Sequence, residues 1–346
     1  MNIRYRMLCL MLGLFSSFCN AEIKPAEKEQ LIAKLVSQIS TYYVETGKVD
    51  QIKQHLEEVQ NSTEYQNSVS NEQFATFLTG ELQKVDKHFA IKWRSPVQQS
   101  QPLAKHESWF SKLARKNSGF NRVEILDGNV GYIDFWGFDA LSSRSRQTVA
   151  QVMGFVAEAD ALILDLRNNG GGSGEMVQLI SSYFLKPNTH LNSIYWHSSG
   201  TTQDFHTLDK IDGKVNLDVP IFILTSANTF SAAEEFAYNL KHLKRATLVG
   251  EVTKGGANPW RFYELTKGFS VAVPIAKAVN PITHSNWEAI GVKPHIESTS
   301  KDAYDIAYYF ALKEVLKAAP DGYLQKEIKD ILLTVEDKSS LNKTSP

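Results

Sequence analysis

Short apolar runs alternate with amphipathic segments over most of the chain after residue 123. The stretch at 161–166, apolar except for Asp165, and the apolar run at 221–224 predict buried strands. Apolar residues recur at helical spacing in 144–157 and 175–185, which predicts amphipathic helices. Strands that alternate with helices indicate an α/β layer fold. We also predict strands at 130–135, 194–196 and 247–249, a hairpin near 261–273, and helices at 302–318 and 321–335.

The N-terminal part has a different pattern, because its apolar positions repeat only at helical spacing. Residues 26–90 predict three helices that would pack as a compact unit. A Pro- and Gln-rich stretch at 95–101 reads as a linker, and 105–117 predicts one amphipathic helix. We therefore expect a helical domain over 22–94, a linker and helix over 95–122, an α/β domain over 123–336 and a polar tail over 337–346.

The chain begins with the features of a secretory signal peptide. Arg4 and Arg6 precede an apolar run at 7–18 that is too short to span a bilayer stably. Small Ala21 suits signal peptidase, so we expect cleavage after it, with an uncleaved anchor as the alternative. Residues 1–21 would then be absent from the mature protein, which we expect to be periplasmic or secreted.

Composition narrows the possible functions. Both cysteines, Cys9 and Cys19, lie in the predicted signal peptide, so the mature chain would have no disulfide, thiolate metal site or cysteine nucleophile. The formal net charge is −1 at pH 7, and it becomes about −3 without Arg4 and Arg6. This balance does not suggest nucleic acid as a partner, and no other apolar run is long enough to cross a membrane. We predict no cofactor and no metal.

A serine at a predicted helix start is the first candidate for chemistry. Ser231 follows the strand at 221–224 and a polar turn, and the helix after it has Ala233 and Phe236 on one face. Backbone N–H groups at a helix start are unpaired, so that of Ala232 could face an oxyanion while Ser231 attacks a carbonyl. The alternative is that Ser231 is only a helix N-cap.

A glycine-rich turn is the second candidate. Gly170–Gly172 directly follow the buried strand at 161–166 and expose backbone N–H groups. This turn could form an oxyanion hole, whereas a phosphate cradle is disfavoured because no Lys-Ser/Thr pair follows the glycines. It could also be only a tight strand-to-helix turn that is braced by Asp165 and Arg167.

Three segments together resemble one enzyme family. They read LILDLRNNGGG at 162–172, LTSANTFSAAEEFA at 224–237 and LVGEVTKGGANP at 248–259. They are similar to the tail-specific or C-terminal processing serine peptidase superfamily, which includes the tricorn protease core and the modules of interphotoreceptor retinoid-binding protein. The resemblance covers roughly residues 74–300. It implies an α/β fold with a ClpP/crotonase-like spiral of ββα units, here preceded by a small N-terminal helical bundle.

One branch of this superfamily uses a lysine as the base, and this sequence does not fit that branch. The lysine would lie 25 residues after the serine, where this chain has Gly256, and Lys254 is out of register by two positions. That branch also carries a PDZ domain, for which the stretch between Trp93 and Val123 is too short. A Ser–Lys dyad is therefore disfavoured.

The branch of the tricorn core and the retinoid-binding modules fits better. LQKVDKHF at 82–89 resembles its D-x-H segment, which would make His88 the base. NWEAIGVKP at 286–294 resembles its N-W-E-G-x-G-V-x-P segment, which implies that Glu288 orients that base. Two residues depart from the family pattern, namely Lys87 in place of a serine and Ala289 in place of a glycine.

The resemblance implies acyl transfer through a Ser–His–Glu set. Neutral His88 would take the Ser231 proton and later protonate the leaving amine. Glu288 would hold the imidazole in the required tautomer and stabilise its charged form. The plain alternatives are a solvated His88 and a surface Glu288, and Asp86 would be a further partner or have no role.

The oxyanion donors would come from the helix start and the glycine turn. They would be the N–H groups of Ala232 and Gly171, because relatives often have proline, which has no N–H, at the position of Gly170. We therefore predict a secreted serine peptidase that acts on a peptide or protein substrate. The rival prediction is a non-catalytic retinoid- or fatty-acid-binding module of the same fold, which would need no intact Ser–His–Glu set.

Overall fold

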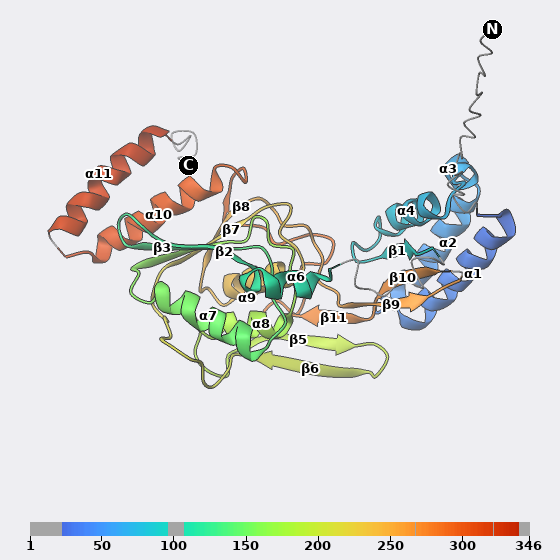
Figure 1. Cartoon of the computed structure of the whole chain (residues 1–346), viewed down its shortest axis with the longest axis horizontal. Helices are drawn as coiled ribbons and strands as arrows, with labels where there is room; N and C mark the ends of the chain where they lie inside the picture. Colours follow the sequence, from blue (N-terminus) through green and yellow to red (C-terminus); the bar gives the residue numbers. More distant parts are fainter. Residues whose placement is uncertain (1–22, 96–106, 267, 321, 339–346) are drawn as a thin grey trace, which may run out of the picture.

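The described residues form three sheets, an N-terminal group of helices and further helices that cover the largest sheet (Figure 1). The computed structural model describes residues 23–95, 107–266, 268–320 and 322–338. The predicted signal peptide and most of the predicted polar tail lie outside the described residues. Within the described ranges, none of the helices combines the length and the apolar character that crossing a membrane requires.

A six-stranded sheet forms the centre of the larger part of the molecule. Its strand order is β12-β8-β7-β4-β3-β2, and all neighbours are parallel except β2 and β3. Parallel neighbours need crossover connections, most of which contain helices here. The strands are β2 (Phe120–Leu126), β3 (Val130–Phe135), β4 (Ala161–Asp165), β7 (Ile221–Thr225), β8 (Thr247–Gly250) and β12 (Ile296–Glu297).

Both faces of this sheet are buried, which explains why its central strands are continuous apolar runs. Leu162 and Leu164 of β4 belong to one core, and Ile163 between them belongs to the other. Figure 1 shows α10 and α11 on the opposite side of the sheet from α7. The helices of the first core are α7 (Ser143–Phe155), α8 (Gly174–Ser181) and α9 (Ala232–His242), and those of the second are α10 (Ala303–Ala318) and α11 (Tyr323–Lys338).

A second, antiparallel sheet extends the first core. It has the order β11-β5-β6, and Leu191, Ile194 and Ala276 on its strands are buried in that core.

The segment before the six-stranded sheet forms a short helix and a 3-10 turn. The elements of the second sheet and of this segment are β5 (His190–Trp196), β6 (Thr201–His206), β11 (Ala276–Val279), α6 (Trp109–Arg115) and η3 (Asn117–Gly119).

The N-terminal helices pack on a third sheet, whose strands come from two distant parts of the chain. β1 pairs with β10, and β10 pairs with β9, in both cases antiparallel. Leu31, Phe74 and Leu78 share one core with Val271 and Val273. The elements are α1 (Pro25–Tyr42), η1 (Thr46–Lys48), α2 (Val49–Gln60), α3 (Thr63–Asn67), α4 (Asn71–Leu82), β1 (Ala90–Trp93), β9 (Trp260–Glu264) and β10 (Phe269–Pro274).

The α/β class predicted from the sequence is confirmed, and the observed elements differ in informative ways. The predicted hairpin near 261–273 is present as β9 and β10, but it completes the helical unit, which the pattern predicted as a self-contained bundle. α8 ends at Ser181, before the predicted end at Leu185, because Tyr183 and Phe184 continue as i→i−3 turns while staying buried. β6 was not predicted, since its residues are mostly polar and exposed.

The pairing of β4 with β7 brings two turns to one edge of the sheet. Asp165 at the end of β4 pairs with Leu224 near the end of β7. The glycine turn after β4 and the turn that leads to Ser231 therefore lie side by side. Hydrogen bonds join the two segments, among them the bond that the Phe230 N–H donates to the Asn169 carbonyl at 3.0 Å.

Asp165 and Arg167 form a brace at the start of the glycine turn. Arg167 Nη2 lies 2.5 Å from Asp165 Oδ2, and Arg167 Nη1 donates to the Ser300 carbonyl at 2.7 Å. The Tyr132 hydroxyl also donates to Asp165 Oδ2, at 2.7 Å. Tyr132 of β3 and the backbone of Ser300, which follows β12, therefore both hold the start of the turn in place.

The substitution Gly172→Ala, which adds one methyl group, tests how tightly the glycine turn is packed. Gly172 has a φ of 149°, and a Cβ there would lie 1.9 Å from the Phe138 carbonyl oxygen, so the backbone must move. We expect Gly172→Ala to lower the free energy of unfolding by ~2–4 kcal/mol, as measured by urea denaturation. In the control Gly154→Ala, the exposed helical site has open space and should gain about 0.5–1 kcal/mol. Similar midpoints for the two variants would contradict this account of the turn.

Candidate active site

Ser231 lies at the start of α9 in a backbone conformation that residues other than glycine rarely adopt. Its φ is 56° and its ψ is −122°. The Ser231 carbonyl accepts a helical bond from the Glu235 N–H at 2.9 Å, whereas the Ala232 N–H has no acceptor in the described part of the chain. The site therefore combines a strained serine with a free N–H at the positive end of a helix.

A buried carboxylate, that of Glu234, ties Ser231 to the loop after β8. Its Oε2 accepts from the N–H groups of Ser231 at 2.8 Å and Gly256 at 2.9 Å. Its Oε1 accepts from the Gly255 N–H at 2.6 Å and the Thr253 hydroxyl at 2.5 Å. Burial raises the pKa of Glu234, although these donors oppose the effect. The four bonds fix the serine backbone relative to that loop.

The glycine turn approaches Ser231 closely. A Cβ on Gly171 would lie 2.8 Å from Ser231 Cβ and 2.9 Å from Ala232 N, and the φ of Gly171 is 86°. Only glycine permits such an approach. The Gly171 N–H donates to Asn169 Oδ1 at 2.9 Å, so in this conformation it already has an acceptor. Its role as an oxyanion donor stays a prediction.

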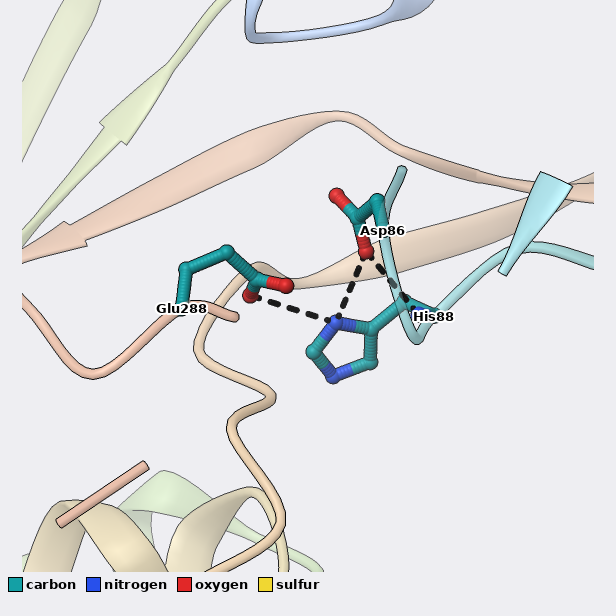
Figure 2. A group of neighbouring side chains, drawn as sticks. All are labelled: Asp86, His88 and Glu288. Atoms are coloured by element: carbon teal, nitrogen blue, oxygen red, sulfur yellow. Dashed lines mark hydrogen bonds and ion pairs between the residues drawn. The ribbon is translucent and has the colours of Figure 1, made fainter. Parts of the chain in front are cut away.

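His88 lies between α4 and β1, with its ring held from one edge. Its backbone N–H donates to Asp86 Oδ1 at 2.9 Å, which closes a short turn. Figure 2 shows that both neighbouring carboxylates face the same ring nitrogen. Nδ1 lies 3.5 Å from Asp86 Oδ1 and 3.6 Å from Glu288 Oε2. The other ring nitrogen, Nε2, is thus the one available for proton transfer.

The two carboxylates make the His88 imidazole strongly basic. Its side chain is only 2% exposed, and this burial favours the neutral ring. Asp86 and Glu288 outweigh the burial and raise the pKa of His88 to about 9. Burial also opposes ionisation of Asp86, but its bonds with His88 hold the pKa of that carboxyl below its usual range. The Tyr43 hydroxyl donates to Asp86 Oδ2 at 3.3 Å.

Glu288 reaches His88 from the loop that follows β11. The same Oε2 atom accepts from the Ala257 N–H at 2.6 Å and from the Asn258 N–H at 3.1 Å. These donors belong to the loop that Glu234 anchors at its other end. One loop therefore connects the carboxylate beside His88 with the carboxylate beside Ser231.

Ser231 lies near His88 but is not bonded to it. The Phe230 ring, directly before Ser231, has its centroid 5.1 Å from that of the His88 ring. Within the described ranges, no hydrogen bond joins the Ser231 side chain to the imidazole. Lys254 Nζ lies 4.6 Å from the centroid of the same Phe230 ring. The structure thus joins His88 with Glu288 and places Ser231 and Lys254 around one phenyl ring.

A cavity of about 690 Å³ opens beside Ser231. Ser231, Ala232 and the glycine turn form part of its lining, so a ligand there would contact the serine hydroxyl. Glu175 and Glu235 are the charged side chains among the described lining residues. The remaining walls are largely apolar, with aromatic side chains from Trp109, Trp196, Phe205, Phe230, Trp260 and Trp287.

Asp86, His88 and Glu288 have the residue types of a small metal site, although none was predicted. Their potential ligand atoms all lie within 4.8 Å of one another. The same arrangement serves an imidazole that is held by two carboxylates, with its other nitrogen directed elsewhere. We interpret the group in that second way, since it lies beside the strained serine.

Some functional residues were missed or underrated from the sequence. Asp86 was predicted only as a further partner, yet it lies as close to the imidazole as Glu288 does. Its spacing of two before His88 suits a turn in which the carboxylate accepts the histidine N–H. Glu235 was not singled out, although its position four after Ser231 puts it on the same helix face.

A family model and a curated relative match this chain. Residues 129–298 match the model of Peptidase family S41, which confirms the superfamily resemblance. A carboxyl-terminal-processing protease from Synechocystis sp. is 33% identical over 168 residues, or 48% of this chain and 37% of that protein. The matched part therefore spans well under two thirds of that relative.

Two solved structures share the fold. A putative peptidase from Parabacteroides merdae has a TM-score of 0.60 at 19% identity, covering 85% of this chain and 99% of that one. A lipoprotein from Streptococcus agalactiae has a TM-score of 0.53 at 17% identity, covering 84% and 98%. Such identities speak for the fold alone, and the family model adds the sequence match. Residues 129–298, just under half of the chain, are therefore the region that is similar to peptidase family S41.

Proposed function

We propose that this chain is an exported serine peptidase in which Ser231 is the nucleophile and His88 is the general base. The observation that carries the proposal is that segments distant in sequence meet around the Phe230 ring, which itself lines the cavity. The strained Ser231 lies beside the free Ala232 N–H. The ring of Phe230, the residue before Ser231, contacts the His88 imidazole, and Glu288 lies beside that imidazole. The match of residues 129–298 to peptidase family S41 supports the same chemistry.

In the proposed reaction, the Ser231 hydroxyl attacks the substrate carbonyl while His88 Nε2 takes the proton. The two carboxylates at Nδ1 stabilise the imidazolium, which then protonates the leaving amine. Water, activated by the same ring, hydrolyses the acyl-enzyme. The transfer needs Ser231 Oγ within about 2.6–3.2 Å of Nε2, and such bonds often tighten only when substrate is bound.

The oxyanion is proposed to form next to the helix start and the glycine turn. The Ala232 N–H is free to donate to it. The second donor comes from Gly171 once its bond to Asn169 is released, or from Gly172, whose N–H has no acceptor within the described residues. Each such donor typically lowers the barrier by about 3 kcal/mol.

The apolar lining of the cavity supports a second candidate, a carrier of retinoid- or fatty-acid-like ligands. Aromatic walls around about 690 Å³ are typical of small-molecule pockets. Titration with a fluorescent fatty acid, beside an assay of casein cleavage, separates the candidates. Saturable binding without any cleavage would favour the carrier over the peptidase.

The assignment of nucleophile and base is testable with three variants. We expect Ser231→Ala to abolish labelling by a fluorophosphonate and to lower peptide cleavage by about 10³-fold or more. His88→Ala should cause a similar loss, because the hydroxyl then has no base. Lys254→Ala should retain cleavage, since the lysine only covers the Phe230 ring.

The reverse pattern would identify the lysine as the base. If Lys254→Ala were inactive while His88→Ala stayed active, the proposed dyad would be wrong. Cleavage in the presence of EDTA is a further control, because a metal held by Asp86, His88 and Glu288 would be removed. We expect no loss of activity with EDTA.

The dependence of cleavage on pH should report the charge on His88. A base must be neutral, and the pKa of His88 is raised to about 9, so kcat/KM should increase as pH rises through about 9. Asp86→Asn removes one of the carboxylates that favour the cation and should move this limb to lower pH. Asp50→Asn, on the exposed surface of α2, is the control and should leave the profile in place. An unshifted limb in Asp86→Asn would exclude Asp86 as a positioning residue.

Export is proposed from the signal-peptide pattern at 1–21. When the full chain is produced in a secreting bacterial host, intact mass should show a protein that begins at Glu22. Recovery of a chain that retains Met1 from the exported fraction would indicate an uncleaved anchor.

A further inference from the structure

The cavity beside Ser231 contains a carboxylate one helical turn beyond the nucleophile. The Glu235 N–H donates to the Ser231 carbonyl at 2.9 Å, so the two residues share one face of α9. Four residues of helix advance the backbone by about 6 Å. A substrate side chain that enters next to Ser231 would therefore run along α9 toward Glu235.

Polar groups around Glu235 are left incomplete. Gly174 of α8 lies next to the Glu235 carboxylate, because a Cβ on Gly174 would lie 3.9 Å from Glu235 Oε2. Asn192 of β5 is 1% exposed and lines the same cavity. Neither polar atom of its side chain has a hydrogen-bond partner among the described residues. Buried amides are normally satisfied. The Asn192 amide lies near enough to the Glu235 carboxyl to favour its charged form, but no hydrogen bond joins the two in the described residues, which leaves both groups available to a ligand.

The charge of the cavity favours a cation. Its described lining contains two acids, Glu175 and Glu235, and no lysine or arginine. The other cavity walls are largely aromatic and aliphatic, with Ile194 and Trp196 from β5 and Phe205 from β6. Such walls suit the methylene stem of a long basic side chain, and aromatic faces attract its charged end.

We infer that this cavity binds the substrate residue whose carbonyl Ser231 attacks, and that Glu235 selects arginine or lysine at that position. The inference rests on the proposed peptidase function. An arginine guanidinium would pair with the Glu235 carboxylate and donate to the Asn192 Oδ1 atom, whereas a lysine ammonium would make the ion pair with fewer bonds. Glu235 is thus a specificity residue, separate from the groups that carry out acyl transfer.

The ionisation of Glu235 links this selection to pH. Burial raises the pKa of Glu235 to about 8, and the nearby Asn192 amide opposes this only in part. Glu175 of α8 is the other charged lining group, and β5 and the 257–260 loop contribute neutral lining residues. Near pH 7 the carboxyl is therefore largely neutral until a cation binds, so the preference for arginine should increase as pH rises past about 8.

The test compares substrates that differ at one position. Fluorogenic peptides carry arginine, lysine, norleucine or glutamate as the residue before the cleaved bond. We expect wild-type kcat/KM to be at least about tenfold higher for arginine than for norleucine, and Glu235→Gln to remove this ratio while norleucine cleavage persists. The protonation of His88 changes kcat/KM for both substrates by the same factor, so it does not affect the ratio. Glu158→Gln, which changes an exposed acid that does not line the cavity, is the matched control and should keep the ratio.

Two results would overturn the inference without affecting the proposed function. One is Ser231-dependent cleavage with no preference for basic residues, and the other is an unchanged ratio in Glu235→Gln. If no peptide is cleaved, the proposed function fails and binding decides the inference. Labelled peptides ending in arginine or norleucine are then titrated against Ser231→Ala and Ser231→Ala/Glu235→Gln by fluorescence anisotropy. Equal affinities for both peptides would exclude a basic subsite.

Discussion

The candidate active site depends on the antiparallel pairing of β1 with β10. His88 lies two residues before β1, and Ala90 of β1 pairs with Ala272 of β10. β10 pairs in turn with β9, the strand that follows the loop in contact with Glu234. The β1–β10 pairing anchors the N-terminal helices to the second half of the chain through one shared core. Without it, the imidazole and the serine would belong to separate bodies. The packing of the β9–β10 hairpin on the N-terminal helices therefore serves to position the candidate active site.

Two carboxylates on one imidazole create an electrostatic compromise. They orient the ring and stabilise its charged form, which helps the step in which the serine proton is taken. They also raise the pKa of His88 to about 9, so the resting ring is mostly charged near neutral pH. Glu288 Oε2 also accepts hydrogen bonds from the N–H groups of Ala257 and Asn258, and these bonds weaken its electrostatic attraction to the charged imidazole. The loop therefore limits how strongly the proton is held.

The sequence predicted the parts of this protein that follow local rules. Continuous apolar runs marked β4 and β7, and the parallel pairing of these strands then explains why the glycine turn and Ser231 meet. His88 and Glu288 were found only through resemblance, because no local pattern says that a turn after α4 reaches a loop two hundred residues later. His88 and Glu288 meet because β1 pairs with β10. The apolar pattern at 269–273 predicts a buried strand, but it does not say which strand will pair with it. Glu235 could have been found from its i+4 spacing, but its cavity requires the second sheet.

The geometry of α9 explains how one helix can serve both reaction and selection. Glu234 and Glu235 are neighbours in sequence, so they project about 100° apart around the helix axis. Glu234 turns toward the loop after β8 and is satisfied by four donors, and this fixes the strained serine. Glu235 turns into the cavity, where few donors meet it and burial favours its neutral form. Two adjacent carboxylates of equal chemistry thereby acquire different tasks, because one is saturated by the protein and the other is left for a ligand.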